Sequence, residues 1–189
     1  LNLDVLGVLN EQYILAQGPS GLVLIDQRAA HERILFEKTL KLASAKAGAG
    51  QGLLIPVTLD LSPADAAVLK KNVKDLQALG FEISDFGSNT FIVNACPAHF
   101  PEQNVKTIIR RLVDDLNDQN TTRKRGDEQF LAASVCHSAV RTKAVLKPEE
   151  IKQLLHDLAR TEIPYSCPRG RPTMVNISYR ELDKKFGRR

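Results

Sequence analysis

Long hydrophobic runs are absent from this chain of 189 residues. A membrane-spanning helix needs roughly 20 consecutive apolar residues, so the sequence excludes one, and we expect no signal peptide. Cysteine is scarce: there are three, and none forms a CxxC pair. An odd, widely spaced set excludes a disulfide framework and predicts a reducing compartment. Internal repeats are also missing, which excludes a repeat architecture.

The charge balance favours neither sign strongly. Lys and Arg number 26 against 22 Asp and Glu, so the net charge is +4. Such a mild excess permits contact with nucleic acid but also occurs in proteins that bind none. Hydrophobic residues at 43% and charged residues at 25% are typical of a globular protein, and the length allows one or two domains. Because the chain starts at Leu1 rather than Met, we expect a fragment of a longer protein.

Strand-like and helix-like segments alternate in the manner of an α+β protein. We expect strands over residues 3–9, 13–17, 22–25, 53–59, 81–86, 90–95 and 174–177. Helices are expected over residues 27–45, 63–79, 104–116, 129–144, 148–158 and 179–186. The clearest helix start is Ser62, an N-cap residue followed by Pro63 at the first helical position. This layout predicts an α+β block at each end of the chain, with a compact βα insertion between them.

Two stretches are expected to be loops. Residues 47–52 are rich in Gly and Ala, which is typical of a flexible segment. Residues 117–127 are polar and contain Arg123-Lys124-Arg125. This second stretch is either a solvated loop or a loop that contacts phosphate.

Three short segments carry side chains that could hold a metal ion. Asp26 and Glu32 flank the start of the first helix, Cys136 lies in the fourth helix, and Cys167 lies in a constrained loop. Two carboxylates and two thiolates satisfy tetrahedral zinc in number, and the carboxylates leave manganese possible. The alternative is structural: the cysteines pack in the core, and Asp26 caps its helix.

The remaining candidate side chains favour other roles. His31 lies on a different helix face from its neighbour Glu32. We therefore expect it to lie at the surface or to contact a partner rather than to bind a metal ion. His137 likewise points away from Cys136. Cys96, which ends a strand, is expected to pack in the core.

Four motifs resemble, in order and spacing, those of one known family. The first is Asp26-Gln27-Arg28-Ala29 with Glu32 and Glu37, which matches the pattern DQHA, two free residues, E, four free residues, E, with arginine for histidine. The others are residues 135–141, residues 167–172 (CPRGRP, where the family has CPHGRP) and residues 186–188. Over essentially its whole length the chain is similar to the C-terminal domain of the MutL family of DNA mismatch-repair proteins.

The resemblance implies a fold, an activity and partners. It implies a dimerisation subdomain formed by residues 1–61 and 126–189, with a regulatory subdomain inserted at residues 62–125. The implied activity is metal-dependent nicking of DNA, with zinc or manganese held by Asp26, Glu32, Cys136 and Cys167, the two carboxylates being catalytic. The implied partners are a second copy, the mismatch-recognition protein MutS, the processivity (sliding) clamp and DNA. The implied location is the bacterial cytoplasm at the nucleoid, or the nucleus in a eukaryote, and ATP binding belongs to a portion outside this chain.

Two positions depart from the family pattern. Arg28 and Arg169 stand where the motifs have histidine, and a guanidinium has no lone pair to give a metal. At about 6 Å and an effective dielectric of about 20, it repels a divalent ion by roughly 5 kcal/mol. These arginines could pair with Asp26 and Glu32 and leave a degenerate, metal-free site. Otherwise the surviving ligands hold an active metal, with the arginines on the scissile phosphate, or a structural zinc.

A second motif concerns the clamp. Residues 51–56 read Gln51-Gly52-Leu53-Leu54-Ile55-Pro56, which resembles the Q-x-x-[LI]-x-P peptide by which nuclease-type MutL proteins bind the processivity clamp. In an extended segment, Leu53, Leu54, Ile55 and Pro56 could enter an apolar groove, with Gln51 hydrogen-bonding at its rim. The alternative is an ordinary edge strand that ends at Pro56.

Overall fold

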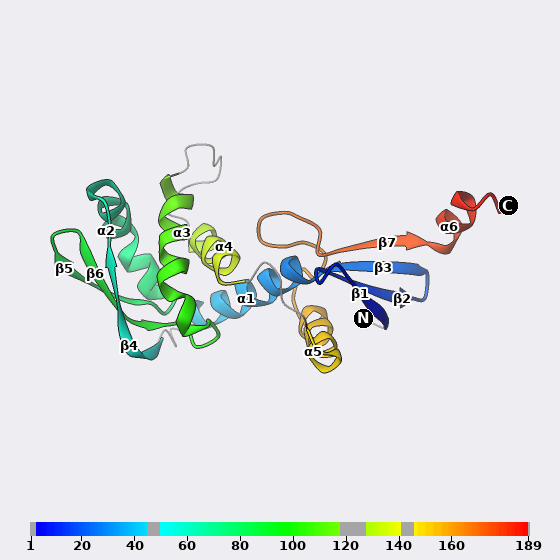
Figure 1. Cartoon of the computed structure of the whole chain (residues 1–189), viewed down its shortest axis with the longest axis horizontal. Helices are drawn as coiled ribbons and strands as arrows, with labels where there is room; N and C mark the ends of the chain where they lie inside the picture. Colours follow the sequence, from blue (N-terminus) through cyan, green and yellow to red (C-terminus); the bar gives the residue numbers. More distant parts are fainter. Residues whose placement is uncertain (1–2, 45–49, 118–127, 141–145, 189) are drawn as a thin grey trace. The chain divides into compact units, whose positions relative to one another are not determined.

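The computed structural model describes residues 3–44, 50–117, 128–140 and 146–188 (Figure 1). Helices and antiparallel sheets make up this part of the chain, so the predicted α+β class is confirmed. None of the described helices combines the length and the apolar character that crossing a membrane requires.

The chain divides into two compact units, and each is described by itself. Unit 1 comprises Leu1–Ile34 and Val140–Arg189, and unit 2 comprises Leu35–Ala139. Helix α1 (Gln27–Ser44) begins in unit 1 and ends in unit 2. The boundaries predicted from the sequence lay at residues 61/62 and 125/126. The observed ones differ because strand pairing and helix packing place the strand at residues 51–60 and the helix at residues 128–139 in unit 2. The dimerisation and regulatory roles of the parts stay predictions.

Unit 1 contains a four-stranded antiparallel sheet, sheet A, in the order β1-β2-β3-β7. The strands are β1 (Asp4–Leu9), β2 (Tyr13–Gly18), β3 (Gly21–Asp26) and β7 (Met174–Ser178). One face is buried against the start of α1 and against α5 (Pro148–Ala159), and the short helix α6 (Tyr179–Lys185) follows β7. The core residues of this face are Ile14, Ala16, Val23, Ile25, Ala30, Ile34, Ile151, Leu154, Leu155 and Leu158.

Unit 2 contains a three-stranded antiparallel sheet, sheet B, in the order β4-β6-β5. The strands are β4 (Gln51–Asp60), β5 (Glu82–Gly87) and β6 (Thr90–Cys96). The helices are α2 (Pro63–Ala78), α3 (Val105–Asn117) and α4 (Glu128–Ala139), and a single 3-10 turn, Glu102–Asn104, precedes α3. The apolar faces of α2, α3 and α4 share one core with sheet B, in which Cys96 is buried as predicted.

Local sequence signals located most elements within a few residues. Ser62 caps α2 as predicted, with its hydroxyl accepting from Asp65 N at 3.2 Å. Two expectations were less accurate: β4 begins at Gln51, inside the stretch expected to be a loop, and α4 ends at Ala139 rather than at residue 144. The predicted loop at residues 118–127, with its Arg-Lys-Arg run, and residues 45–49 lie outside the described part of the chain.

Candidate functional site

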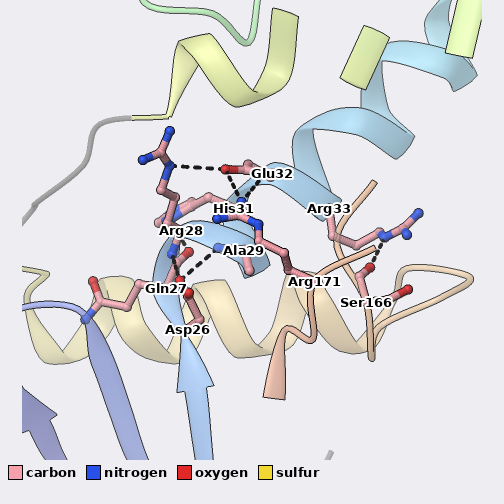
Figure 2. Close-up of polar contacts among 9 residues, drawn as sticks. All are labelled: Asp26, Gln27, Arg28, Ala29, His31, Glu32, Arg33, Ser166 and Arg171. Atoms are coloured by element: carbon pink, nitrogen blue, oxygen red, sulfur yellow. Dashed lines mark hydrogen bonds and ion pairs between the residues drawn. The ribbon is translucent and has the colours of Figure 1, made fainter. Parts of the chain in front are cut away.

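Asp26 caps helix α1. It is the last residue of β3, and its Oδ1 accepts hydrogen bonds from the backbone N–H groups of Arg28 at 2.9 Å and Ala29 at 3.0 Å (Figure 2). Both donors belong to the first turn of α1, which has no partners for them within the helix. The structure thus shows the capping contact that the sequence allowed for Asp26, and its role as a metal ligand stays a prediction.

Glu32 lies at the centre of a buried ion-pair cluster, one turn further along α1. Only 1% of its side chain is exposed. Arg171 Nη2 donates to both carboxylate oxygens, at 2.9 Å and 2.7 Å, and Arg28 Nε donates to Oε1 at 3.1 Å (Figure 2). Two guanidinium groups therefore neutralise this carboxylate and donate three hydrogen bonds to it. We call Arg28, Glu32 and Arg171 the Glu32 cluster.

The loop that supplies Arg171 is folded tightly and held against α1. Cys167 N donates to Arg171 O at 2.7 Å, and Gly170 N donates to Cys167 O at 2.9 Å. A third arginine, Arg33, donates from Nε to Ser166 O at 2.6 Å (Figure 2). Burial lowers the pKa of Arg171, but the hydrogen bonds and charges of Glu32 and Cys167 outweigh it and raise that pKa above its ordinary value. Arg171 therefore stays charged throughout the range in which proteins are folded.

The two carboxylates among the candidate metal ligands are engaged by other groups of unit 1. Asp26 and Glu32 are engaged by backbone N–H groups and guanidinium groups, while Cys167 is buried in the same unit. Cys136 belongs to unit 2. Within the described ranges, no three His, Cys, Asp or Glu side chains are grouped so that they could hold a metal ion. The described residues around Glu32 thus fit an ion pair better than a divalent cation.

The structure shows the partner of one of the two motif arginines. Arg28 pairs with Glu32, as one alternative foresaw. The second guanidinium on Glu32 is that of Arg171, a residue of the motif at 167–172 for which no role was predicted. Glu32 and Arg171 are 139 residues apart, so no local spacing could have signalled their pairing. The only available signal was the density of arginine in residues 167–172.

Cys136 lies in a different polar environment, inside unit 2. Its Sγ is 3.7 Å from Thr39 Oγ1, which is 2.7 Å from His99 Nε2 and donates to Leu35 O at 2.8 Å. Because the single hydroxyl proton goes to Leu35 O, the proton between Thr39 and His99 comes from Nε2. Cys136 is buried in the apolar core of unit 2 beside this Thr39–His99 pair.

His99 should make the stability of unit 2 depend on pH. Burial and, secondarily, Lys38 lower the pKa of His99 below its ordinary value of 6.5. The unfolded chain therefore binds this proton more readily, and its stabilising contribution, present above pH 6.5, is lost as the pH falls through the folded pKa. We expect the urea midpoint to fall between pH 7.5 and 5.5, and to fall less in His99→Gln, whose amide can still donate to Thr39. Equal declines in both proteins would contradict this assignment.

The segment that resembles a clamp-binding peptide, residues 51–56, departs in part from the hydrogen-bonded pairing of sheet B. Strand β4 pairs with β6 through Gln51 and Gly52 and again from Val57 onward, with a register shift between them. Between these points Leu54 is 90% exposed and Ile55 is 76% exposed, whereas Leu53, also predicted to contact the clamp, is half-buried against the core of unit 2. Gln51 Nε2 donates to Glu102 Oε1 at 3.1 Å. The segment therefore presents two large apolar side chains on a fixed, extended backbone.

Sheet A carries a second apolar surface, on the face opposite its core. Strand register places Leu15, Leu24 and Val175 side by side across three strands, and it places Leu22 beside Ile177 in the next row. These five residues define what we call the outer face of sheet A. Val175 is 51% exposed, and the four others are half-buried.

Comparison with known proteins identifies the family. The model of the MutL C terminal dimerisation domain matches residues 6–146. The chain belongs to this family. The match begins within β1 and includes β2, β3, all of α1 and the rest of unit 2, but not β7.

Relatives in the family extend the similarity over the whole chain. The DNA mismatch repair protein MutL of Symbiobacterium thermophilum is 40% identical over 98% of the chain, which corresponds to 30% of that protein. The MutL proteins of Geobacter sp. (strain M21) and Koribacter versatilis are 38% and 35% identical, each over 99% of the chain and 29% of their own length. The chain thus spans about three tenths of the length of the curated relatives it matches.

Proposed function

We propose that this MutL C-terminal domain joins two copies of its protein through the outer face of sheet A. The observation that carries the proposal is the row of Leu15, Leu24 and Val175. A sheet with two apolar faces needs a covering layer on each, and the helices of unit 1 named above bury the opposite face. Soluble monomers rarely expose a contiguous apolar patch of this kind.

Symmetry favours a second copy of the same chain as that layer. A two-fold axis lets one patch bury itself against its own image, so a single apolar row serves both partners. Cross-strand neighbours such as Leu22 and Ile177 widen the patch on either side of the axis. The domain would thereby act as the junction at which two mismatch-repair proteins are held together.

Light scattering during size-exclusion chromatography tests this function directly. We expect a mass twice that of the chain, which is 20.9 kDa, at micromolar concentration. A mass equal to a single chain at about 100 µM, well above the Kd of a stable dimer, would remove the proposal.

We propose further that the Glu32 cluster is an ion pair that replaces a metal site. Its support is geometric: both Glu32 oxygens accept from Arg171, and Arg28 reaches the same carboxylate. The rival is an active endonuclease that uses Asp26, Glu32, Cys136 and Cys167. Elemental analysis of tag-free protein dialysed against trace zinc separates them. We expect no bound zinc, whereas near-stoichiometric zinc that Cys136→Ala or Cys167→Ala removes would favour the endonuclease.

A second function is supported by the exposed segment of β4. We propose that Leu54 and Ile55 dock in an apolar groove of the processivity clamp. Their exposure and the surrounding register shift free them for a partner, in agreement with the motif. The alternative of a strand that ends at Pro56 is less suitable, because β4 continues to Asp60.

Clamp binding is tested with a double alanine variant. We expect Leu54→Ala/Ile55→Ala to weaken binding to purified bacterial clamp at least tenfold by surface plasmon resonance, because each buried aliphatic side chain contributes about 1.5–3 kcal/mol. The matched control is Phe86→Ala, which removes an apolar side chain that is 74% exposed on the same sheet. Equal binding by the double variant and the wild type would show that the clamp docks elsewhere or not at all.

The other implied partners stay predictions. The relatives are DNA mismatch repair proteins of bacteria, which favours action on DNA beside MutS in the bacterial cytoplasm, at the nucleoid.

A further inference from the structure

The edge of sheet A at β1 borders a groove that neither the dimer face nor the Glu32 cluster uses. A cavity of about 400 Å³ lies between the start of β1 and the outer side of α5. It is lined by Leu3, Asp4, Val5, Lys152, Leu155, His156 and Ala159. Its volume falls within the range of about 300–1,000 Å³ that is typical of ligand sites. We call it the β1–α5 groove.

The strand side of the groove offers unpaired backbone. Strand β1 pairs only with β2 among the described strands, so its other edge carries free N–H and C=O groups. Its side chains are apolar and exposed at Val5, Leu6, Val8 and Leu9, and no lysine or proline blocks the edge. Such an edge accepts another extended segment as an added strand.

The helix side of the groove supplies a pocket and a charge. Leu155 forms part of the apolar floor, together with Leu3 and Val5, and Ala159 leaves space beside it. Strand register points the side chain of Val5 to the same face as buried Ala16, and the side chain of Asp4 to the opposite face. Lys152 makes no ion pair within the described residues, and His156 accepts from Arg160 at 3.2 Å.

We propose that the β1–α5 groove binds an extended peptide segment of another protein, which adds as a strand to β1. Alternate apolar side chains of the peptide enter the cavity beside Leu155, and an acidic side chain pairs with Lys152. The unpaired backbone of β1 selects a peptide in the extended form, and the cavity selects apolar side chains at alternate positions of that peptide. The positive charge of Lys152 selects an acidic side chain. The site is independent of the dimer face, because Val5 and Leu155 lie on the core side of sheet A.

The test uses a displayed library of random peptides of about ten residues, enough to cover a strand of ordinary length. The library is first depleted of peptides that bind the Ala159→Trp variant, in which the indole ring occupies the groove. The remaining peptides are then selected on the wild-type protein. We expect enriched peptides with alternating β-branched or aromatic residues and at least one Asp or Glu. Absence of enrichment after depletion would overturn the proposal.

Charge variants and the oligomeric state complete the test. A synthetic copy of an enriched peptide should bind Lys152→Glu at least tenfold more weakly. It should bind Lys184→Glu, the same charge change on α6, within twofold of the wild type. The amide hydrogens of β1 should exchange more slowly when the peptide is bound. Unchanged affinity for Lys152→Glu, or conversion of the wild-type dimer to a monomer by Ala159→Trp, would show that a peptide is not the occupant.

Discussion

Replacing Val175 by glutamate is expected to separate the dimer into single chains, with a rise in Kd of at least a hundredfold. Val175 is 51% exposed in the single chain, so glutamate can be accommodated there without disturbing the core. Across a two-fold axis the new carboxylate appears twice on one buried surface. Burying an unpaired charge costs several kcal/mol, and each 1.4 kcal/mol is about a factor of ten in Kd.

Sedimentation equilibrium over a range of concentrations measures the change. The control is Ile163→Glu, which introduces the same charge in the same unit at a side chain that is 53% exposed but lies outside sheet A. It should leave the dimer intact, and circular dichroism should show both variants folded. If Val175→Glu changes Kd by less than threefold, the two copies meet on another surface.

Glu32→Gln is expected to lower the free energy of unfolding by about 2 kcal/mol. Hydrogen bonds to charged groups contribute about 1.5–3 kcal/mol each when removal leaves their partners unsatisfied. Here the side chains of Arg28 and Arg171 are 21% and 45% exposed, so water hydrates them in part and reduces the loss. A larger fall would follow if both arginines were fully buried.

The matched control is Asp26→Asn. Asparagine caps helices as well as aspartate does, and its Oδ1 can accept from the same two N–H groups, so we expect a change below about 0.5 kcal/mol. Urea unfolding measures both variants, with and without zinc. A ligand that binds the folded state at about 100 times its Kd raises stability by about 2.7 kcal/mol. A zinc-dependent rise in the wild type that Cys167→Ala abolishes would contradict the ion-pair assignment and favour a metal site.

The Glu32 cluster and the β4 segment show how far the motifs reached. The family motifs located Asp26, Arg28 and Glu32 on one helix start, and this proximity follows from a helical repeat of 3.6 residues. They also selected Leu54 and Ile55, whose exposure no local rule predicts. The bulge that exposes them depends on how β6 pairs with β4 at both ends of the segment.

The sequence by itself determined the α+β class, the approximate limits of most helices and strands, and membership of the MutL family. Periodicity, capping residues and turn residues act within a few positions, so they can be read along the chain. Only the tertiary structure decided which guanidinium groups neutralise Glu32, which residues form the outer face of sheet A, and where the β1–α5 groove lies. Each of these joins residues far apart in sequence, because burial and strand register, rather than spacing, determine which surfaces meet.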